Sequence, residues 1–357
     1  MARLGDYVRI RTGKLDANAS SENGRYPFFT CAVEPLRIDS YSYDCECVLV
    51  AGNGDLNVKY YNGKFDAYQR TYIIESIDKS VLSVPYLYFF LDKYVETLRY
   101  EAIGGVIKYI KLGNLTEAQI PLLSLEAQAK VVCEIDKAND LISLRKQQLT
   151  KLDELVKARF VELFENSNYP IIRLGDVCTK ITDGTHKTPT YLESGITFIS
   201  AKNIVNGELD FSEIKHISEQ EYDEIQRRCQ TEIGDILLSK SGSLGSPVIV
   251  KTTQKLGLFE SLAVIKYDRD RLLPEFLCEQ LKTDRIQRQF KVGTKGVAIK
   301  HLHLGVIADT DIVIPPIEEQ QVFAAFVEQT DKSKLVVQQS LDNLELLKKS
   351  LMQKYFG

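Results

Sequence analysis

The 357-residue sequence lacks several features that would place a protein in a class at once. It contains no run of about 18 apolar residues, so no stretch is predicted to cross a bilayer as a helix. The opening segment Met1–Asp6 is not followed by the apolar region of a secretory signal, and we expect a cytoplasmic protein. The seven cysteines include no Cys-x-x-Cys pair, which is typical of free thiols in a reducing compartment.

Catalytic signatures are missing too. No Gly-x-x-x-x-Gly-Lys-Ser/Thr loop is present, and Ser239–Ser243 is too short and wrongly ordered to be one. His301 and His303 could share one face of a strand, but no cluster of His or Cys supplies further metal ligands. Ile314–Ile317 resembles the Pro-Pro motif of adenine methyltransferases, but isoleucine replaces the amide and no glycine-rich cofactor loop accompanies it. We therefore expect a chain without catalytic residues, metal or cofactor of its own.

A strong positive charge is also absent. The net charge is −4, and basic and acidic residues nearly balance within 1–125 and within 169–316. From Lys282 to Lys300, however, lysines and arginines far outnumber the single acidic residue Asp284. Any surface for nucleic acid must therefore be local, and a charge run taken alone is equally typical of a solvated face.

What the chain does contain is a duplicated helical pattern. When Gln128 is aligned with Gln320, four apolar residues fall on apolar residues of the second copy without a gap: Leu149, Leu152, Leu155 and Phe164 on Leu341, Leu344, Leu347 and Phe356. Apolar residues recur three and four apart with a sustained repeat of seven, which predicts long helices with a coiled-coil seam. About 40 helical residues span roughly 60 Å. The alternative is two ordinary amphipathic helices, each capping its own domain. The predicted seam residues are Ile142, Leu149, Leu152, Val156, Leu163, Val337, Leu341, Leu344 and Leu351.

The duplication extends into the segments that precede each helix. Arg3–Asp6 recurs as Arg173–Asp176. The motifs at both ends of the head recur in the same order, and the second copy is longer in its interior. A tandem duplication accounts for this order and implies approximate two-fold symmetry. The predicted parts are a first globular head at 1–124, a central spacer helix at 125–168, a second head at 169–315 and a C-terminal spacer helix at 316–357.

Each head is predicted to be built mostly from short strands. Cys47–Ala51 runs into the turn Gly52–Gly54, and Ile236–Ser239 runs into a corresponding turn. Lys59–Phe65 contains an Asn-Gly pair and is predicted to form a hairpin. The predicted fold class is therefore α+β, with two long antiparallel coiled-coil helices between the heads. Shorter helices are expected at Pro85–Tyr100, Glu219–Gln226 and Pro274–Phe290.

Two polar segments in each head are candidates for contact with DNA. Gly104–Tyr109 and Lys295–His301 combine glycine, which allows close backbone approach, with a lysine suited to a phosphate. Thr12–Asn18 and Thr182–Thr188 carry donors and acceptors of the kind that read base edges. Plain surface loops are the alternative for each segment alone. The candidate DNA-binding residues are Lys14, Asn18, Asn53, Lys108, Tyr109, Thr185, His186, Lys187, Lys202, Asn203, Lys240, Ser241, Ser243, Lys291, Lys295, Lys300 and His301.

The doubled order of these motifs resembles the specificity subunit of type I restriction-modification systems. The resemblance rests on the Leu-Gly-Asp openings, the Gly-x-x-Ile-Lys segments and the exits into the long helices. Ile312–Gln320 is close to the exit motif of that family, and Ile120–Gln128 is a degraded version without the Pro-Pro pair. The resemblance covers essentially the whole chain.

This resemblance implies two target-recognition domains, each binding one half of a split double-stranded DNA site, with the helices as an antiparallel spacer. It implies two methyltransferase (modification) subunits and restriction subunits as partners, which would bind S-adenosylmethionine and ATP. Because the heads differ in sequence, the DNA site is expected to be asymmetric. Two alternatives stay open: a recognition module of a related type II assembly, and a coiled-coil scaffold whose heads bind protein.

Overall fold

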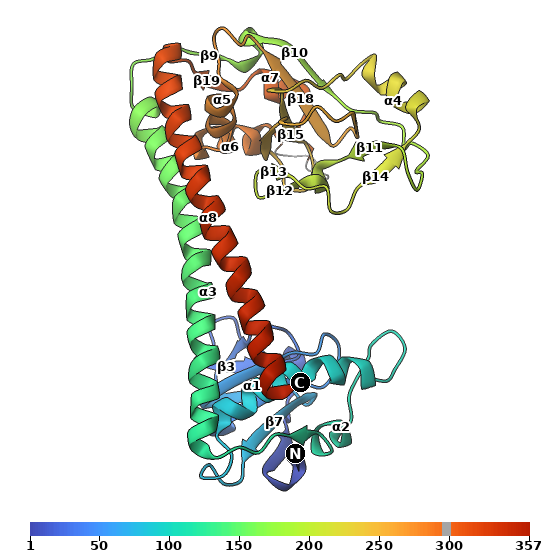
Figure 1. The fold of residues 1–357 in the computed structure, drawn as a ribbon, viewed down its shortest axis with the longest axis vertical. Coiled ribbons are helices and arrows are strands. Elements are labelled where there is room, and N and C mark those ends of the chain that lie inside the picture. Colours follow the sequence, from blue (N-terminus) through green and yellow to red (C-terminus); the bar gives the residue numbers. More distant parts are fainter. Residues whose placement is uncertain (295–300) are drawn as a thin grey trace. The chain divides into compact units, whose positions relative to one another are not determined.

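The computed structural model describes residues 1–294 and 301–357. These residues form two compact units, each of which contains one head and part of both long helices (Figure 1). Unit 1 consists of Met1–Lys146 and Gln339–Gly357, and unit 2 of Gln147–Gln338. No helix in the described part of the chain combines the length and apolar character needed to cross a membrane.

A six-stranded sheet forms the centre of the head in unit 1. Its strand order is β2-β7-β5-β6-β3-β4, and all neighbours are antiparallel except β3 and β6. Successive residues of a strand point to opposite faces: Val48 packs with helix α1 (Val84–Glu101), whereas Leu49 joins a second cluster around Phe65. Both faces of the central strands are therefore buried. The strands are β2 (Val8–Thr12), β3 (Tyr26–Phe29), β4 (Leu36–Ile38), β5 (Tyr43–Ala51), β6 (Val58–Ala67) and β7 (Thr71–Ser76).

The head in unit 2 has the same strand plan with additions. In its four-stranded sheet β10-β18-β15-β16 all neighbours are antiparallel, and β11 pairs with β17 in parallel, as β3 does with β6. Strands β16 and β17 together thus take the place of β6. The added residues form a hairpin, β12 with β13, and helix α4 (Glu219–Gln226). The bounds are β10 (Cys178–Asp183), β11 (Ile196–Ile199), β12 (Ile204–Val205), β13 (Glu208–Leu209), β14 (Lys215–Ile217), β15 (Ile236–Ser239), β16 (Pro247–Ile249), β17 (Leu256–Leu258) and β18 (Leu262–Tyr267).

The repeated Arg-Leu-Gly-Asp motif closes each head on its own exit segment. The N–H of Leu4 donates to the carbonyl of Ala118, and the N–H of Leu174 donates to that of Thr310, both at 2.8 Å. Both leucines are fully buried. The motif is therefore repeated because each head uses it to join its first and last strands. The joined pairs are β1 (Ala2–Arg3) with β8 (Gln119–Ile120), and β9 (Ile171–Arg173) with β19 (Asp311–Val313). Short helices α2 (Leu112–Thr116) and α7 (Leu304–Ala308) precede β8 and β19.

The two long helices are α3 (Leu125–Phe160), which continues into a π-helical turn at Val161–Glu165, and α8 (Ile317–Phe356). Within each unit they run antiparallel, because residues later in α3 meet residues earlier in α8. The contacts are Glu134 with Tyr355 and Lys146 with Glu345 in unit 1, and Asp153 with Lys334 and Phe160 with Phe323 in unit 2. A long helix between two globular domains, and the α+β class, are thus confirmed.

The nine predicted seam residues all lie at least half-buried in the structure. Val156, Val337 and Leu341 are buried, and the other six are half-buried. Adjacent apolar residues such as Leu144 and Leu346, by contrast, are 58% and 66% exposed. The seven-residue pattern therefore separates the packed face of each helix from a solvent-facing apolar flank.

Two local predictions were wrong. Lys59–Phe65 is not a hairpin, because β6 continues through the Asn-Gly pair and β5 pairs with all of Lys59–Phe65. Gly63 accommodates this with a φ of 136°, opposite Cys45. The helix expected at Pro274–Phe290 is divided into α5 (Pro274–Leu281) and α6 (Asp284–Gly293). Thr283 between them is extended, and the Gln287 side chain donates to the Leu281 carbonyl at the end of α5.

Candidate nucleic-acid interface

The polar loop after the first long strand is held in the same way in both heads. Gly13 follows β2 and Gly184 follows β10. A Cβ at either glycine would lie 2.1 Å from a backbone oxygen, that of Ala67 or that of Leu258. Each position therefore requires glycine, which fixes the path of the residues that follow. The correspondence of these two loops, inferred from their order in the sequence, is seen in their backbone contacts.

The turn after β5 and the turn after β15 also correspond. In unit 1 the N–H of Gly52 donates to the Arg70 carbonyl at 2.8 Å, and the Gly52 carbonyl accepts from Ile110 at 3.0 Å. Lys240 takes the position of Gly52 in unit 2. The N–H of Lys240 donates to the Ser261 carbonyl at 2.7 Å, and the Lys240 carbonyl accepts from the N–H of Leu302 at 2.9 Å.

A third polar segment is attached to the turn after β5 in unit 1. Ile103 and Tyr109 exchange backbone hydrogen bonds of 3.0 and 2.8 Å, which close the loop between them. The Lys108 carbonyl accepts from the N–H of Gly54 at 2.9 Å, so this loop is fixed to the turn after β5. The first two polar segments thus meet at residues 67–71, and the third is attached to the second of them.

The candidate residues of unit 1 mostly face solvent. Lys14, Asn18, Lys108 and Tyr109 are exposed, and Asn53 is half-buried because it pairs with Tyr109. The sequence analysis did not single out the exposed Arg70, whose carbonyl binds Gly52. Its position in a short turn between two strands was the only available signal.

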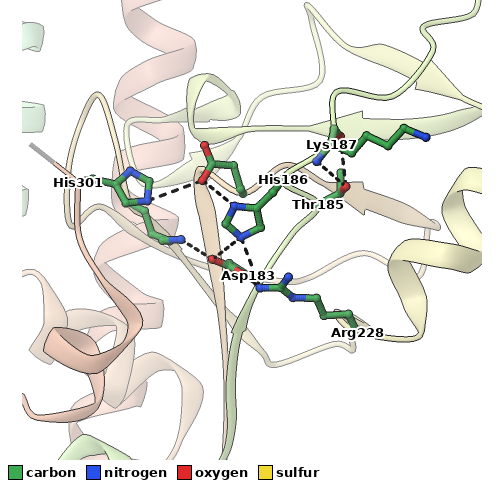
Figure 2. Close-up of polar contacts among 8 residues, drawn as sticks. Asp183, Thr185, His186, Lys187, Arg228 and His301 are labelled. Atoms are coloured by element: carbon green, nitrogen blue, oxygen red, sulfur yellow. Dashed lines mark hydrogen bonds and ion pairs between the residues drawn. The ribbon is translucent and has the colours of Figure 1, made fainter. Parts of the chain in front are cut away.

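The corresponding place in unit 2 is an ion-pair network centred on Asp183 (Figure 2). Lys240 Nζ lies 2.5 Å from Asp183 Oδ2, and Arg228 also pairs with this carboxylate. His186 bridges two acids: its Nε2 lies 3.4 Å from Asp183 Oδ2 and its Nδ1 lies 3.4 Å from Glu260 Oε2. Figure 2 shows His301 beside this network, where its Nε2 lies 3.8 Å from Glu260 Oε2.

The surroundings of this network lower the pKa of two of its members, Asp183 and His301. Burial alone would raise the pKa of the Asp183 carboxyl, but the hydrogen bond and charge of Lys240, with the charges of Arg228 and His186, hold it below its usual value. Burial, followed by the charge of Lys240, lowers the pKa of the His301 imidazole. Asp183 is therefore a stable carboxylate at neutral pH, and His301 is neutral there.

Two candidate residues differ from the expectation of direct DNA contact. Lys240 is only 3% exposed, and its ammonium group is held by Asp183. Asn203 is 8% exposed, and its side chain bonds to backbone groups of Ser200, Asp210 and Glu213. Both side chains hold loops in place inside the head. The residue types of Lys240 and Asn203 suggested contact with DNA. Lys240 is instead held by Asp183, 57 positions away, and Asn203 by backbone groups within ten positions of it.

The other candidates of unit 2 remain available at or near the surface. His186 and Lys187 are exposed, and Thr185 is half-buried with its hydroxyl bonded to the backbone of Lys187. Lys202, Ser243 and Lys291 are exposed, and Ser241 and His301 are half-buried. Lys295 and Lys300 lie outside the described residues.

Three residues of this network were not among the candidate DNA-binding residues: Asp183, Arg228 and Glu260. Of these, only Asp183 lies within a candidate segment, Thr182–Thr188. Arg228 also lines a hollow of about 270 Å³ between the His186 loop and α4, where Glu221 and Glu224 contribute acidic groups. Because α4 has no counterpart in unit 1, this hollow is specific to the second head. Among the described residues no group of three or more His, Cys, Asp and Glu side chains is placed to hold a metal.

The fold and the two loop clusters define a two-headed binding protein. Equivalent backbone frameworks present different side chains: Lys14 and Arg70 in one head, His186 and Lys187 in the other. The family model for the type I restriction modification DNA specificity domain matches residues 1–154 and 166–346. The chain therefore belongs to the family of type I restriction-modification DNA specificity proteins, a family that provides DNA sequence recognition.

Several known proteins are similar to the chain. The EcoDI specificity subunit of Escherichia coli is 37% identical over 154 residues, which are 43% of this chain but only 34% of that relative. The EcoBI specificity subunit of Escherichia coli is 22% identical over 87% of this chain and 73% of its own length. The chain thus spans about a third of one relative and about three quarters of the other.

Solved structures show the same fold. The S subunit of a type I restriction-modification system from M. genitalium aligns with all of this chain and 95% of its own, with a TM-score of 0.55 and 17% identity. A chain from a structure describing complex assembly and conformational transition of the type I R-M system aligns over 99% and 96%, with a TM-score of 0.59 and 17% identity.

Proposed function

We propose that this chain selects a bipartite, asymmetric double-stranded DNA site, with each head reading one half-site. The observation that carries the proposal is the pair of equivalent loop frameworks with different side chains. Equal frameworks place both heads on DNA in a similar way, and unequal side chains give them different base preferences. A net charge of −4 is compatible with this function because partner subunits share the contacts with phosphates.

The long helices serve in this proposal as a spacer between half-sites and as the docking surface for two methyltransferase subunits. Their exposed apolar flank supports the second role. Leu141 and Leu144 on α3 are 45% and 58% exposed, and Leu346 and Leu347 on α8 are 66% and 49% exposed. Apolar side chains grouped on a helix surface are typical of a surface that a partner covers.

The partner subunits, in this proposal, carry the chemistry. The methyltransferase subunits bind S-adenosylmethionine and modify DNA, restriction subunits bind ATP and cut it, and this chain contributes specificity in the cytoplasm without catalysis. The EcoDI relative is a type I restriction enzyme specificity subunit, which supports this division of labour.

Single-molecule methylation sequencing tests the proposal. DNA is taken from cells that express this chain with the methyltransferase encoded beside it, and from cells that express the methyltransferase alone. We expect adenine methylation in a split, asymmetric motif only when both proteins are present. Absence of such methylation, with both proteins expressed and associated, would contradict it.

A second candidate function is a scaffold whose heads bind protein. The exposed leucines of α3 and α8 favour a protein partner on the long helices in either case. The same cells distinguish the two. A scaffold would associate with partners but leave the methylation pattern unchanged. A type II assembly would still give a split motif, but without separate restriction subunits in the purified complex.

A further inference from the structure

One glutamine joins the head to the long helix in unit 1. Gln128, in the first turns of α3, is fully buried. Its side-chain oxygen accepts from the N–H of Ser83 at 2.9 Å, and its amide nitrogen donates to the carbonyls of Val81 and Leu123 at 2.8 and 2.9 Å. Ser83 is the residue before α1, and Leu123 belongs to the exit segment. A single side chain thus ties three parts of the chain together.

An equivalent glutamine does the same in unit 2. Gln320 is fully buried in the first turns of α8. Its oxygen accepts from the N–H of Leu273, the residue before α5, at 2.9 Å. Its nitrogen donates to the carbonyls of Arg271 and Pro315, both at 2.9 Å. The same three-way connection is therefore built twice from segments with different sequences.

Only an amide of this length satisfies all three groups. It supplies one acceptor and two donors, whereas a carboxylate would face two carbonyl oxygens with no proton to donate. A methionine would fill the space but leave one buried N–H and two buried carbonyls without this partner. Neither glutamine reaches solvent, so neither is available to touch DNA or a partner directly.

We propose that Gln128 and Gln320 are positioning residues that fix the angle between each head and its long helix, and so determine which half-site spacing is accepted. This inference rests on the proposed function, because it assumes that each head reads one half-site. Without the amide, the head remains attached through the exit segment and apolar packing, and the hydrogen bonds that restrain its rotation about that segment are lost. The base-reading loops are unaffected, because they lie at other ends of the strands.

The test measures spacing in the assembled complex. The Gln320→Met chain is combined with its methyltransferase, and methylation is measured on DNA substrates whose spacer is shorter or longer than the optimum by one base pair. We expect the rate on these substrates, relative to the optimum, to rise about tenfold, the factor that corresponds to 1.4 kcal/mol. The bases accepted within each half-site should not change. Gln128→Met should give the same result through the other head.

The neighbouring residue provides a matched control. Gln321 has the same side chain, lies on the same helix and is exposed, so Gln321→Met should leave the spacing ratio unchanged. If Gln320→Met lowers the melting temperature while strict spacing is retained, the glutamine is merely structural and the proposal is overturned. If that chain does not assemble, the rate on off-length spacers relative to the optimum is measured with Gln320→Asn instead. This substitution keeps the amide but shortens its reach, and we expect the same direction of change. Failure of the unmodified complex to methylate any split motif would instead overturn the proposed function.

Discussion

At the scale of single residues, the two heads differ in charge at one pair of positions. Unit 2 places Asp183 before its loop glycine and Lys240 in the turn after β15, whereas unit 1 has Thr12 and Gly52 at these places. The charged pair is almost fully buried, with side-chain exposures of 4% and 3%. A buried ion pair is costly to break, because the remaining charge has no partner. The second head therefore depends on a contact that the first head does not have.

Replacing the carboxylate tests this dependence. We expect Asp183→Asn to destabilise the protein by about 3–5 kcal/mol, because Lys240 would be left buried without a counter-charge. Urea denaturation measures the loss. Asp176→Asn, which changes an exposed aspartate in the same head, should stay within about 0.5 kcal/mol of the unmodified protein. Equal effects of both substitutions would show that the pair contributes nothing specific.

The pH dependence of the same contact has a definite sign. The folded-state pKa of Asp183 is lowered, so its stabilisation is present above the unfolded-state pKa of about 3.9 and disappears as the pH falls through the folded value. We expect the stability difference between the unmodified and Asp183→Asn proteins to be constant from pH 7 to about pH 5, and to shrink below about pH 4. A difference that grew on acidification would contradict this assignment.

A phosphate contact is expected at Lys108. This lysine is exposed, and its backbone is fixed to the turn after β5. Lys108→Ala should weaken binding to all DNA sequences to a similar extent and reduce the salt slope by about 1. Fluorescence anisotropy of the assembled complex at several salt concentrations measures both. Lys130→Ala, on the exposed face of α3, is the control. A change confined to one base of a half-site would instead identify Lys108 as a base contact.

At the scale of elements, the long helices determine what can be changed without disturbing the heads. Each helix passes from one compact unit to the other, at Lys146 and Gln147 in α3 and at Gln338 and Gln339 in α8. The packed face repeats every seven residues, so a whole heptad can be added while the apolar seam stays in phase.

Adding seven residues at both of these boundaries should lengthen the accepted spacer. Seven helical residues add about 10.5 Å, and each base pair of B-DNA rises by about 3.4 Å. We therefore expect a spacer about three base pairs longer, with both half-sites preserved, in methylation sequencing. Four residues added to α3 alone should abolish methylation, because they move its seam out of phase with α8. An unchanged spacer after the heptad insertion would exclude the spacer role.

At the scale of the whole molecule, much of the organisation was readable from the sequence. Duplicated motifs predicted two similar heads, and a seven-residue repeat predicted both helices. Sequence patterns did not reveal the burial of Lys240, because its partner Asp183 is 57 positions away. Nor did they show that Asn62 and Gly63 continue a strand, because that depends on β5 lying alongside. Local patterns thus gave the elements, and contacts between distant residues decided which polar side chains stay free.

The independence of the heads leads to a prediction for specificity. His186 is exposed in the loop of the second head, so His186→Ala should relax the choice at one base pair of one half-site by about 1–3 kcal/mol. The other half-site should be unchanged. Lys14→Ala, at the corresponding loop of the first head, should relax the choice in the other half-site and leave the first unchanged. Methylation sequencing measures both, and a change in both half-sites from a single substitution would contradict the division of labour.

Unit 1 is made from both ends of the chain: Met1–Lys146 needs Gln339–Gly357. Met352 is part of its buried core, and the ring of Phe356 lies 5.1 Å from that of Tyr86. During translation, the ribosome therefore releases the first head long before the segment that completes its core. Domains usually fold in the order of their synthesis, but here the unit that begins first is finished last. Until then its apolar surface is open to chaperones, and a premature stop codon in the part of α8 that precedes Gln338 would leave both units incomplete.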